Sequence, residues 1–146
     1  MKRHMPFFMA IIIGMIFGNL IFDSYETETV MTSDGNVYML QYGAYTSESV
    51  MQENVKNLDK NAYIVVIQEK VYYVYLAITT NYYNALNIKE HYNDEDIFLY
   101  IKENYLGNSE LINKIKNIDN LLKDESNRED IFYYAKESLN LYKKYY

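Results

Sequence analysis

Aromatic side chains recur at alternate positions in two segments of high strand propensity. Tyr73 and Tyr75 lie two residues apart in KVYYVYLAIT, and Phe98 and Tyr100 have the same spacing in DIFLYIK. Alternate residues of a strand point to the same face of a sheet. Aromatic rings gathered in this way can stack on the apolar faces of sugars or bases, while tyrosine hydroxyls hydrogen-bond polar ligands. Because the chain holds eighteen tyrosines, strand propensity alone is the competing explanation.

A third strand is predicted from Val37 to Tyr45, in the run VYMLQYGAY. Alternation along the three strands separates a core set from an open-face set. We expect these residues in the core: Leu40, Tyr42, Val74, Leu76, Leu99 and Ile101. We expect these on the open face: Met39, Gln41, Gly43, Tyr73, Tyr75, Phe98 and Tyr100. This open face is aromatic and almost uncharged, and the Gln41 amide is its main polar group.

Two helices and a hairpin are predicted between these strands. Strand-like runs from Ala62 to Gln68 and from Lys70 to Thr79 are separated by little more than Glu69 and Lys70, which indicates a hairpin. One helix is expected from about Glu48 to Leu58 and a second to about His91. Their N-terminal caps are expected at Thr46 or Ser47 and at Thr80 or Asn81.

The segment from Asp96 to Lys102 has two readings. Alternation of Ile97, Leu99 and Ile101 favours a strand, whereas the preceding acidic residues and the later Gly107 could start and end a helix. The strand would complete a βαββαβ order. We therefore predict an α+β, ferredoxin-like domain, with a four-stranded antiparallel sheet and two helices on one face.

Two amphipathic helices are expected after Gly107. Ser109 can cap the first, and Ser126 with Glu129 forms a capping-box pattern before the second. Their apolar residues recur at helical spacing: Leu111, Ile112, Ile115, Ile118, Leu122, Ile131, Ala135, Leu139 and Tyr142. We predict a helical hairpin over residues 105–146, which either packs on the sheet domain or binds a separate partner.

The N-terminal region predicts a membrane anchor. Met5 to Phe22 holds no charged residue, follows Lys2 and Arg3, and precedes an acidic stretch, so the amino terminus is expected in the cytoplasm. A cleaved signal peptide is the alternative, although no small-x-small cleavage site follows. The predicted organisation is a cytoplasmic stub and anchor over 1–22, a tether over 23–36, a sheet domain over 37–104 and the hairpin over 105–146.

Composition argues against several function classes. Without Lys2 and Arg3, twelve basic residues stand against twenty acidic ones, a net charge of −8, so nucleic acid is not an expected partner. The chain has no cysteine. His91 has no nucleophile in its sequence context, and His91 to Asp96 (HYNDED) lacks the spacing of a calcium loop, so it is interpreted as a turn. We expect no enzyme activity, no metal and no cofactor.

The segment from Tyr38 to Lys102 resembles the SPOR (sporulation-related) domain family of bacterial cell-envelope proteins. The likeness rests on MLQYGAY at Met39 to Tyr45, on YYVYLAIT at Tyr72 to Thr79, and on Ala85 eight residues after Ala77. Ala77 replaces a glycine that is usual in the family, and Tyr73 and Tyr75 stand where arginine or other polar residues are frequent.

This resemblance implies a βαββαβ sheet domain outside the cytoplasm that binds peptidoglycan glycan strands at septa. The glycan-contacting positions of the family fall on Gln41, Ala44, Tyr73, Tyr75 and Tyr100. With the predicted anchor, the expected protein is a single-pass membrane protein whose C-terminal domain binds the wall during cell division or sporulation. The alternative is a cell-envelope scaffold that binds a protein partner through the sheet face or the C-terminal helices, without binding glycan.

Overall fold

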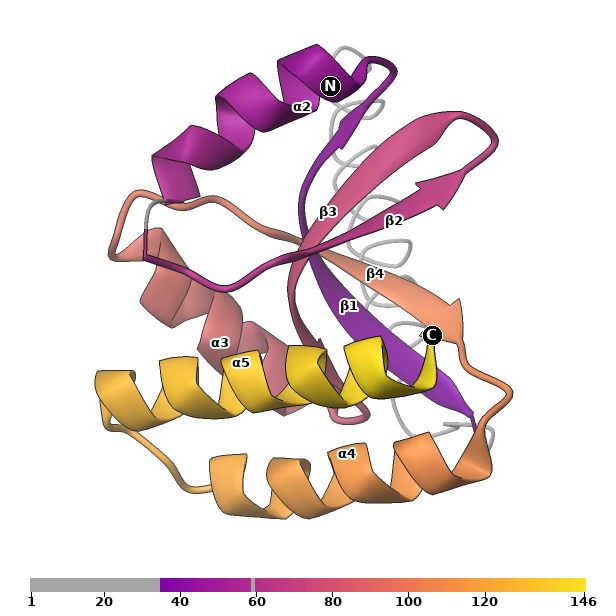
Figure 1. Ribbon diagram of the computed structural model, residues 1–146. Coiled ribbons are helices and arrows are strands. Elements are labelled where there is room, and N and C mark those ends of the chain that lie inside the picture. The colour runs from indigo at the N-terminus through magenta and orange to yellow at the C-terminus, as the bar shows by residue number, and fades with distance from the viewer. Residues whose placement is uncertain (1–34, 59) are drawn as a thin grey trace, which may run out of the picture. The chain divides into compact units, whose positions relative to one another are not determined.

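A computed structural model describes residues 35–58 and 60–146 (Figure 1). The elements are β1 (Asn36–Tyr45), α2 (Glu48–Val55), the short 3-10 helix η1 (Lys56–Leu58), β2 (Ile64–Gln68), β3 (Val71–Thr79), α3 (Tyr82–Asn93), β4 (Tyr100–Tyr105), α4 (Ser109–Leu122) and α5 (Arg128–Tyr145). The predicted anchor, and all but the last residues of the predicted tether, lie outside the described residues. No helix in the described ranges combines the length and apolar character needed to cross a bilayer.

The four strands form one sheet in the order β2-β3-β1-β4, and every neighbouring pair is antiparallel. This confirms the predicted α+β class and the predicted antiparallel sheet. The β2–β3 hairpin turns at Glu69 and Lys70, whose φ angles are 49° and 66°. Two successive residues with positive φ match the right-handed twist of hairpin strands, so the turn can be this short.

Helices α2 and α3 cover one face of the sheet. Tyr38 and Leu40 of β1 pack there in a core cluster with Met51 of α2 and with Ala85 and Ile88 of α3. The Asn81 side chain caps α3 by accepting hydrogen bonds from two backbone N–H groups. Both helices lie close to their predicted ranges, because their apolar residues recur at helical spacing.

The fourth strand exists, but it starts at Tyr100 rather than at Asp96. Asp96 has a φ of 59°, and the Ile97 N–H bonds to the Tyr92 carbonyl across five residues. These are features of a Schellman-type helix end, in which a residue in the left-handed conformation closes the helix. The acidic residues therefore end α3 and do not begin a new helix. The helix reading of this segment is wrong, and the strand reading is correct with a later start.

Helices α4 and α5 form the predicted hairpin, with different caps. Asn108 accepts a hydrogen bond from the Leu111 N–H, and Asn127 accepts from two N–H groups of the first turn of α5. The caps expected at Ser109 and Ser126 are therefore wrong. Asparagine and serine are equally good N-caps, so propensity alone did not separate neighbouring polar residues.

The hairpin packs on the sheet face that was predicted to be open. Val37 and Met39 of β1 and Ile78 of β3 form a second core cluster with Leu111 and Ile115 of α4 and Leu139 of α5. In Figure 1, α5 crosses the sheet in front of the strands, and the turn end of the β2–β3 hairpin projects beyond it. The expectation that helices cover only one face is wrong, and the expected packing of the hairpin on the sheet domain is observed.

Two polar side chains of the hairpin, Ser138 and Asp119, fix it to the sheet. The pairing of β2 with β3 ends at Ile64 and Tyr75, beyond which the edge of β3 is left without β2. There the Ser138 hydroxyl of α5 accepts a hydrogen bond from the Ile78 N–H at 3.0 Å. Asp119 of α4 is buried and accepts from the Thr79 hydroxyl and from the Thr80 N–H, the latter at 2.7 Å. A buried donor left unpaired costs free energy, so these contacts hold the helices in one position.

Candidate ligand-binding surface

The structure brings the five predicted site residues together at one end of one sheet face. Tyr75 of β3 pairs with Gln41 of β1, and Gln41 pairs with Tyr100 of β4, which makes a row across three strands. Ala44 pairs with Tyr73 beside this row. Directly paired residues of neighbouring strands project on the same side. The period-two alternation therefore placed Gln41, Tyr73, Tyr75 and Tyr100 correctly with respect to one another, whereas Ala44 was assigned to this face only by the resemblance.

A bulge in β1 explains why Ala44 shares this face and Gly43 does not. Gln41 pairs with Tyr75 and Gly43 with Val74, so Tyr42 is the extra residue. An extra residue reverses the alternation beyond it. A Cβ on Gly43 would lie 2.6 Å from the Tyr45 ring carbon Cζ, and Tyr45 packs against the α2–α3 core. The prediction that Gly43 lies on the open face is wrong.

The five predicted site residues differ in how far they are buried. Tyr100 is 63% exposed, Ala44 is exposed and Tyr73 is half-buried. Gln41 and Tyr75 are only 8% and 5% exposed, and Tyr75 belongs to the core beneath the hairpin. The expectation that both are surface residues is wrong, because the sequence pattern of a strand does not show which helix will later cover it. The surface left for a ligand is the uncovered end of the sheet face.

The other residues expected on the open face do not extend this surface. Met39 is buried under the hairpin, and Phe98 is exposed but precedes β4. The uncovered end therefore consists of Tyr100, Ala44 and Tyr73, with Gln41 and Tyr75 at its border.

The Gln41 side chain is the most informative polar group of this surface. Among the described residues it makes no side-chain hydrogen bond, although the residue is mostly buried. No fully buried side-chain nitrogen or oxygen of the described residues lacks a partner, so the Gln41 amide must reach the surface. An amide that reaches the surface between Tyr75 and Tyr100, without a protein partner, can donate to a ligand and accept from it.

The tyrosines beside Gln41 present ordered rings. The rings of Tyr73 and Tyr75 stack with centroids 6.4 Å apart and an interplanar angle of 15°. Burial raises the pKa of the Tyr75 hydroxyl above 10, and the Asn104 side chain opposes this shift by hydrogen bonding. Asn104 of β4, which the sequence patterns did not single out, also donates to the Met39 sulfur at 3.0 Å. Burial therefore favours the neutral hydroxyl of Tyr75, and the ring stack holds the side chain at the border of the surface.

His91 and the acidic residues 94–96, which the sequence offered as candidate functional groups, have structural roles. The His91 Nδ1 lies 2.9 Å from the Asn87 carbonyl oxygen of the same helix. Residues 94–96 form the expected turn, and Arg128 of α5 pairs with Glu95 at 2.6 Å and with Asp94 at 3.4 Å. Within residues 35–58 and 60–146, no group of three or more His, Cys, Asp or Glu side chains could hold a metal ion.

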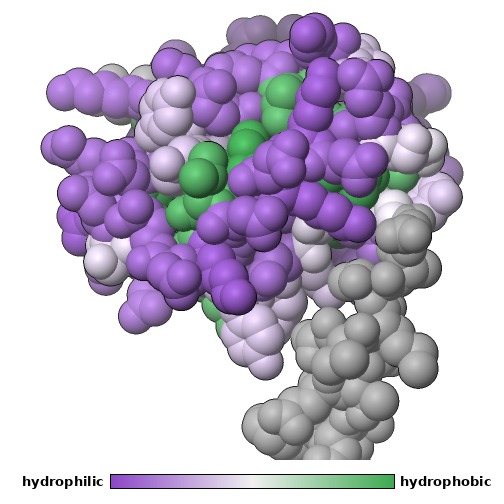
Figure 2. Space-filling model, turned by 90° about the horizontal axis from the view of Figure 1, so that it is seen from below, coloured by the Kyte–Doolittle hydropathy of each residue, from purple (hydrophilic) through white to green (hydrophobic). Residues whose placement is uncertain are grey.

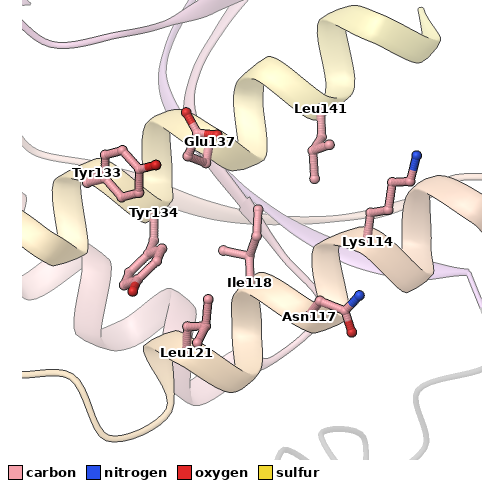
Figure 3. A pocket seen from close by; sticks show the side chains of 8 residues that line it. All are labelled: Lys114, Asn117, Ile118, Leu121, Tyr133, Tyr134, Glu137 and Leu141. Carbon is pink, nitrogen blue, oxygen red and sulfur yellow. The ribbon is translucent and has the colours of Figure 1, made fainter.

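A groove between α4 and α5 is a second surface feature. Seen from below, the molecule shows a band of apolar side chains bounded by hydrophilic ones (Figure 2). The cavity between the two helices has a volume of about 330 Å³, and Ile118, Leu121 and Leu141 face into it (Figure 3). Its remaining lining residues are Lys114, Asn117, Tyr133, Tyr134 and Glu137. None of the five predicted site residues lines this groove.

Comparisons with known proteins gave one structural likeness. No protein-family model matches the chain, and a search of curated proteins found no match. The solution structure of the peptidoglycan binding domain of the B. subtilis cell wall lytic enzyme CwlC is similar to this chain at 17% sequence identity, with a TM-score of 0.42. The likeness covers 51% of this chain and 96% of that chain.

Proposed function

We propose that this protein binds peptidoglycan glycan strands, without catalysing a reaction, through the uncovered end of its sheet. The observation that carries the proposal is the Gln41 amide, which lacks a hydrogen-bond partner among the described residues and lies between Tyr75 and Tyr100. Sugar rings have apolar faces and polar edges. Tyrosine rings stack on such faces, and an amide both donates to and accepts from hydroxyl groups.

The cellular setting is part of the proposal. The basic residues before Met5 to Phe22 and the acidic residues after it support a single-pass anchor with the sheet domain outside the cytoplasm. The resemblance of Tyr38 to Lys102 to SPOR domains supports a role at a division or sporulation septum. Such an anchor would hold the glycan-binding surface at the cell wall.

Retention of the full-length chain, purified in mild detergent, on isolated peptidoglycan tests this function. We expect retention to increase after amidase treatment, which removes stem peptides and uncovers glycan. Gln41→Leu, which removes the amide at similar volume, and Tyr100→Ala should both weaken retention. Tyr83→Ala is the matched control, because Tyr83 is an exposed tyrosine of α3. Background retention of the unaltered chain on both samples would overturn the proposal.

The α4–α5 groove favours a second candidate function, that of an envelope scaffold for a protein partner. Leu121 is 58% exposed at the groove, and Ile118 and Leu141 lie beside it. If the protein is a scaffold, the charged substitution Leu121→Glu should abolish its septal localisation. If it is a glycan binder, the same substitution should leave its localisation unchanged. Truncation after Leu106 would not separate the two, because it removes the α4 and α5 part of the second core.

A further inference from the structure

The C-terminal end of α5 lies beside the tyrosines of the sheet. Tyr142 packs against the same core cluster as Tyr73, and that cluster contains Tyr75. The Tyr142 side chain is also one of the groups that raise the pKa of Tyr75, after burial and together with Tyr73. The helix that covers one part of the sheet face therefore brings a further tyrosine to the border of the uncovered part.

Tyr142 continues into a second stacked pair. Its ring stacks on Tyr146, with centroids 4.9 Å apart and an interplanar angle of 21°. Tyr142 is half-buried, whereas Tyr146 is 66% exposed. The two residues are four positions apart, so they lie on the same side of the helix end. An exposed ring stacked on a fixed one is held in place and still presents a free face.

We propose that Tyr142 and Tyr146 are additional binding residues of the same surface, so that the sugar-binding platform continues from the sheet onto α5. This inference rests on the proposed function and deepens it. The Tyr73–Tyr75 pair and the Tyr142–Tyr146 pair come from different elements, and the less buried member of each, Tyr73 and Tyr146, presents its ring to the ligand. The ligand class is accordingly an oligosaccharide that contacts both pairs, and a single sugar would contact only one of them.

The contrast between Tyr146 and Tyr133 gives a matched test. Tyr133 of α5 is likewise an exposed tyrosine, at 57%, with its ring centroid 5.5 Å from that of Tyr134, but it lines the α4–α5 groove. Tyr146→Ala at the C-cap of α5 and Tyr133→Ala within α5 therefore remove the same side chain at two different surfaces. The measurement is the affinity of the full-length chain in detergent for purified glycan strands released by amidase digestion.

We expect Tyr146→Ala to bind about two- to tenfold more weakly, the range for one lost aromatic contact, and Tyr133→Ala to bind as the unaltered chain does. Chitotetraose should compete for the site at much lower concentration than N-acetylglucosamine. Equal affinity of the two variants would overturn the inference and leave the proposed function standing. No binding by the unaltered chain would overturn both.

A second measurement uses only the unaltered chain, so its result does not depend on whether a variant folds. Addition of the glycan strands to the unaltered chain should shift the ring proton signals of Tyr146 in NMR spectra and leave those of Tyr133 in place. Shifts at Gln41 and Tyr100 without any at Tyr146 would confine the ligand to the sheet and overturn the role of α5.

Discussion

The two ends of one sheet face differ in what lies over them. At one end, Val37, Met39 and Ile78 are buried beneath α4 and α5. At the other end, Tyr100 and Ala44 of the same face are exposed to solvent. Both ends belong to the same strands, and two register shifts in the β1–β3 pairing, at Leu40/Gln41 and at Gln41/Gly43, interrupt the alternation between them. The strand sequences alone therefore do not separate a core surface from a binding surface. The placement of the C-terminal hairpin makes that distinction.

The border between the two ends runs through a single row of paired residues. Tyr75 belongs to the core, Tyr100 to the surface, and Gln41 lies between them with an unpaired amide. A ligand at this border would therefore contact rigid side chains that packing has already fixed. Preorganised groups lose little conformational entropy on binding, which favours affinity.

The largest expected effect is a contrast in stability across this row. Tyr75→Ala should lower the free energy of unfolding by about 3–5 kcal/mol, because it empties a large buried site. Tyr100→Ala should change it by no more than about 0.5 kcal/mol, because the ring is exposed. Denaturant unfolding measures both. Similar losses of unfolding free energy for the two variants would mean that the border between the buried and the exposed end does not lie between Tyr75 and Tyr100.

The second contrast lies within α4. Ile115→Ala should cost about 2–5 kcal/mol of unfolding free energy, since Ile115 is fully buried against the sheet. Leu121→Ala, on the exposed side of the same helix, should stay within about 0.5 kcal/mol. If Ile115→Ala were equally mild, the hairpin would be a detachable appendage and the covered end would not be core.

The third prediction concerns the polar link between α4 and β3. Asp119→Ala removes the carboxylate that accepts from Thr79, Thr80 and Asn84. The Asn84 amide and the Thr79 hydroxyl keep backbone carbonyl acceptors, so the main loss is at the partly buried Thr80 N–H. We expect a loss of about 1–3 kcal/mol in unfolding free energy. Asp124→Ala, at an exposed site beyond the end of α4, is the control and should be nearly neutral. Equal effects would show that the carboxylate network does not hold the hairpin on the sheet.

The smallest effect is a pH dependence from the same carboxyl group. Burial raises the pKa of Asp119 above its ordinary 3.8, and the hydrogen bonds from Thr79, Thr80 and Asn84 oppose that rise. Between 3.8 and the raised value, the folded state binds more protons than the unfolded state. The Asp119 contribution to the unfolding free energy should therefore be highest below pH 3.8 and decline as the pH rises through the folded pKa.

Comparison with Asp119→Asn isolates this contribution from that of the other acidic residues. The difference in unfolding free energy between the unaltered chain and the variant should fall with rising pH in the acid range and stay constant above it. A difference that increases with pH would mean that the hydrogen bonds outweigh burial and that the folded pKa is lowered.

Much of the fold could be predicted from local patterns. Alternation along a strand follows from backbone geometry, so Gln41, Tyr73, Tyr75 and Tyr100 could be assigned to one face without coordinates. Apolar residues at helical spacing predicted α4 and α5 in the same way, and the short β2–β3 turn followed from the distance between two strand-like runs. These features depend on neighbours in sequence.

The exposure of the candidate site depended on contacts between distant segments. The burial of Tyr75 and the register that places Ala44 rather than Gly43 on the ligand face come from the packing of α5 and from a bulge in the β1–β3 pairing. Asp119 likewise looks like a solvated residue of an amphipathic helix until its donors in β3 and α3 are known. Burial is set by whichever element covers a side chain. For Gln41 and Tyr75, the covering helices α4 and α5 lie more than thirty residues further along the chain, beyond the reach of any local pattern.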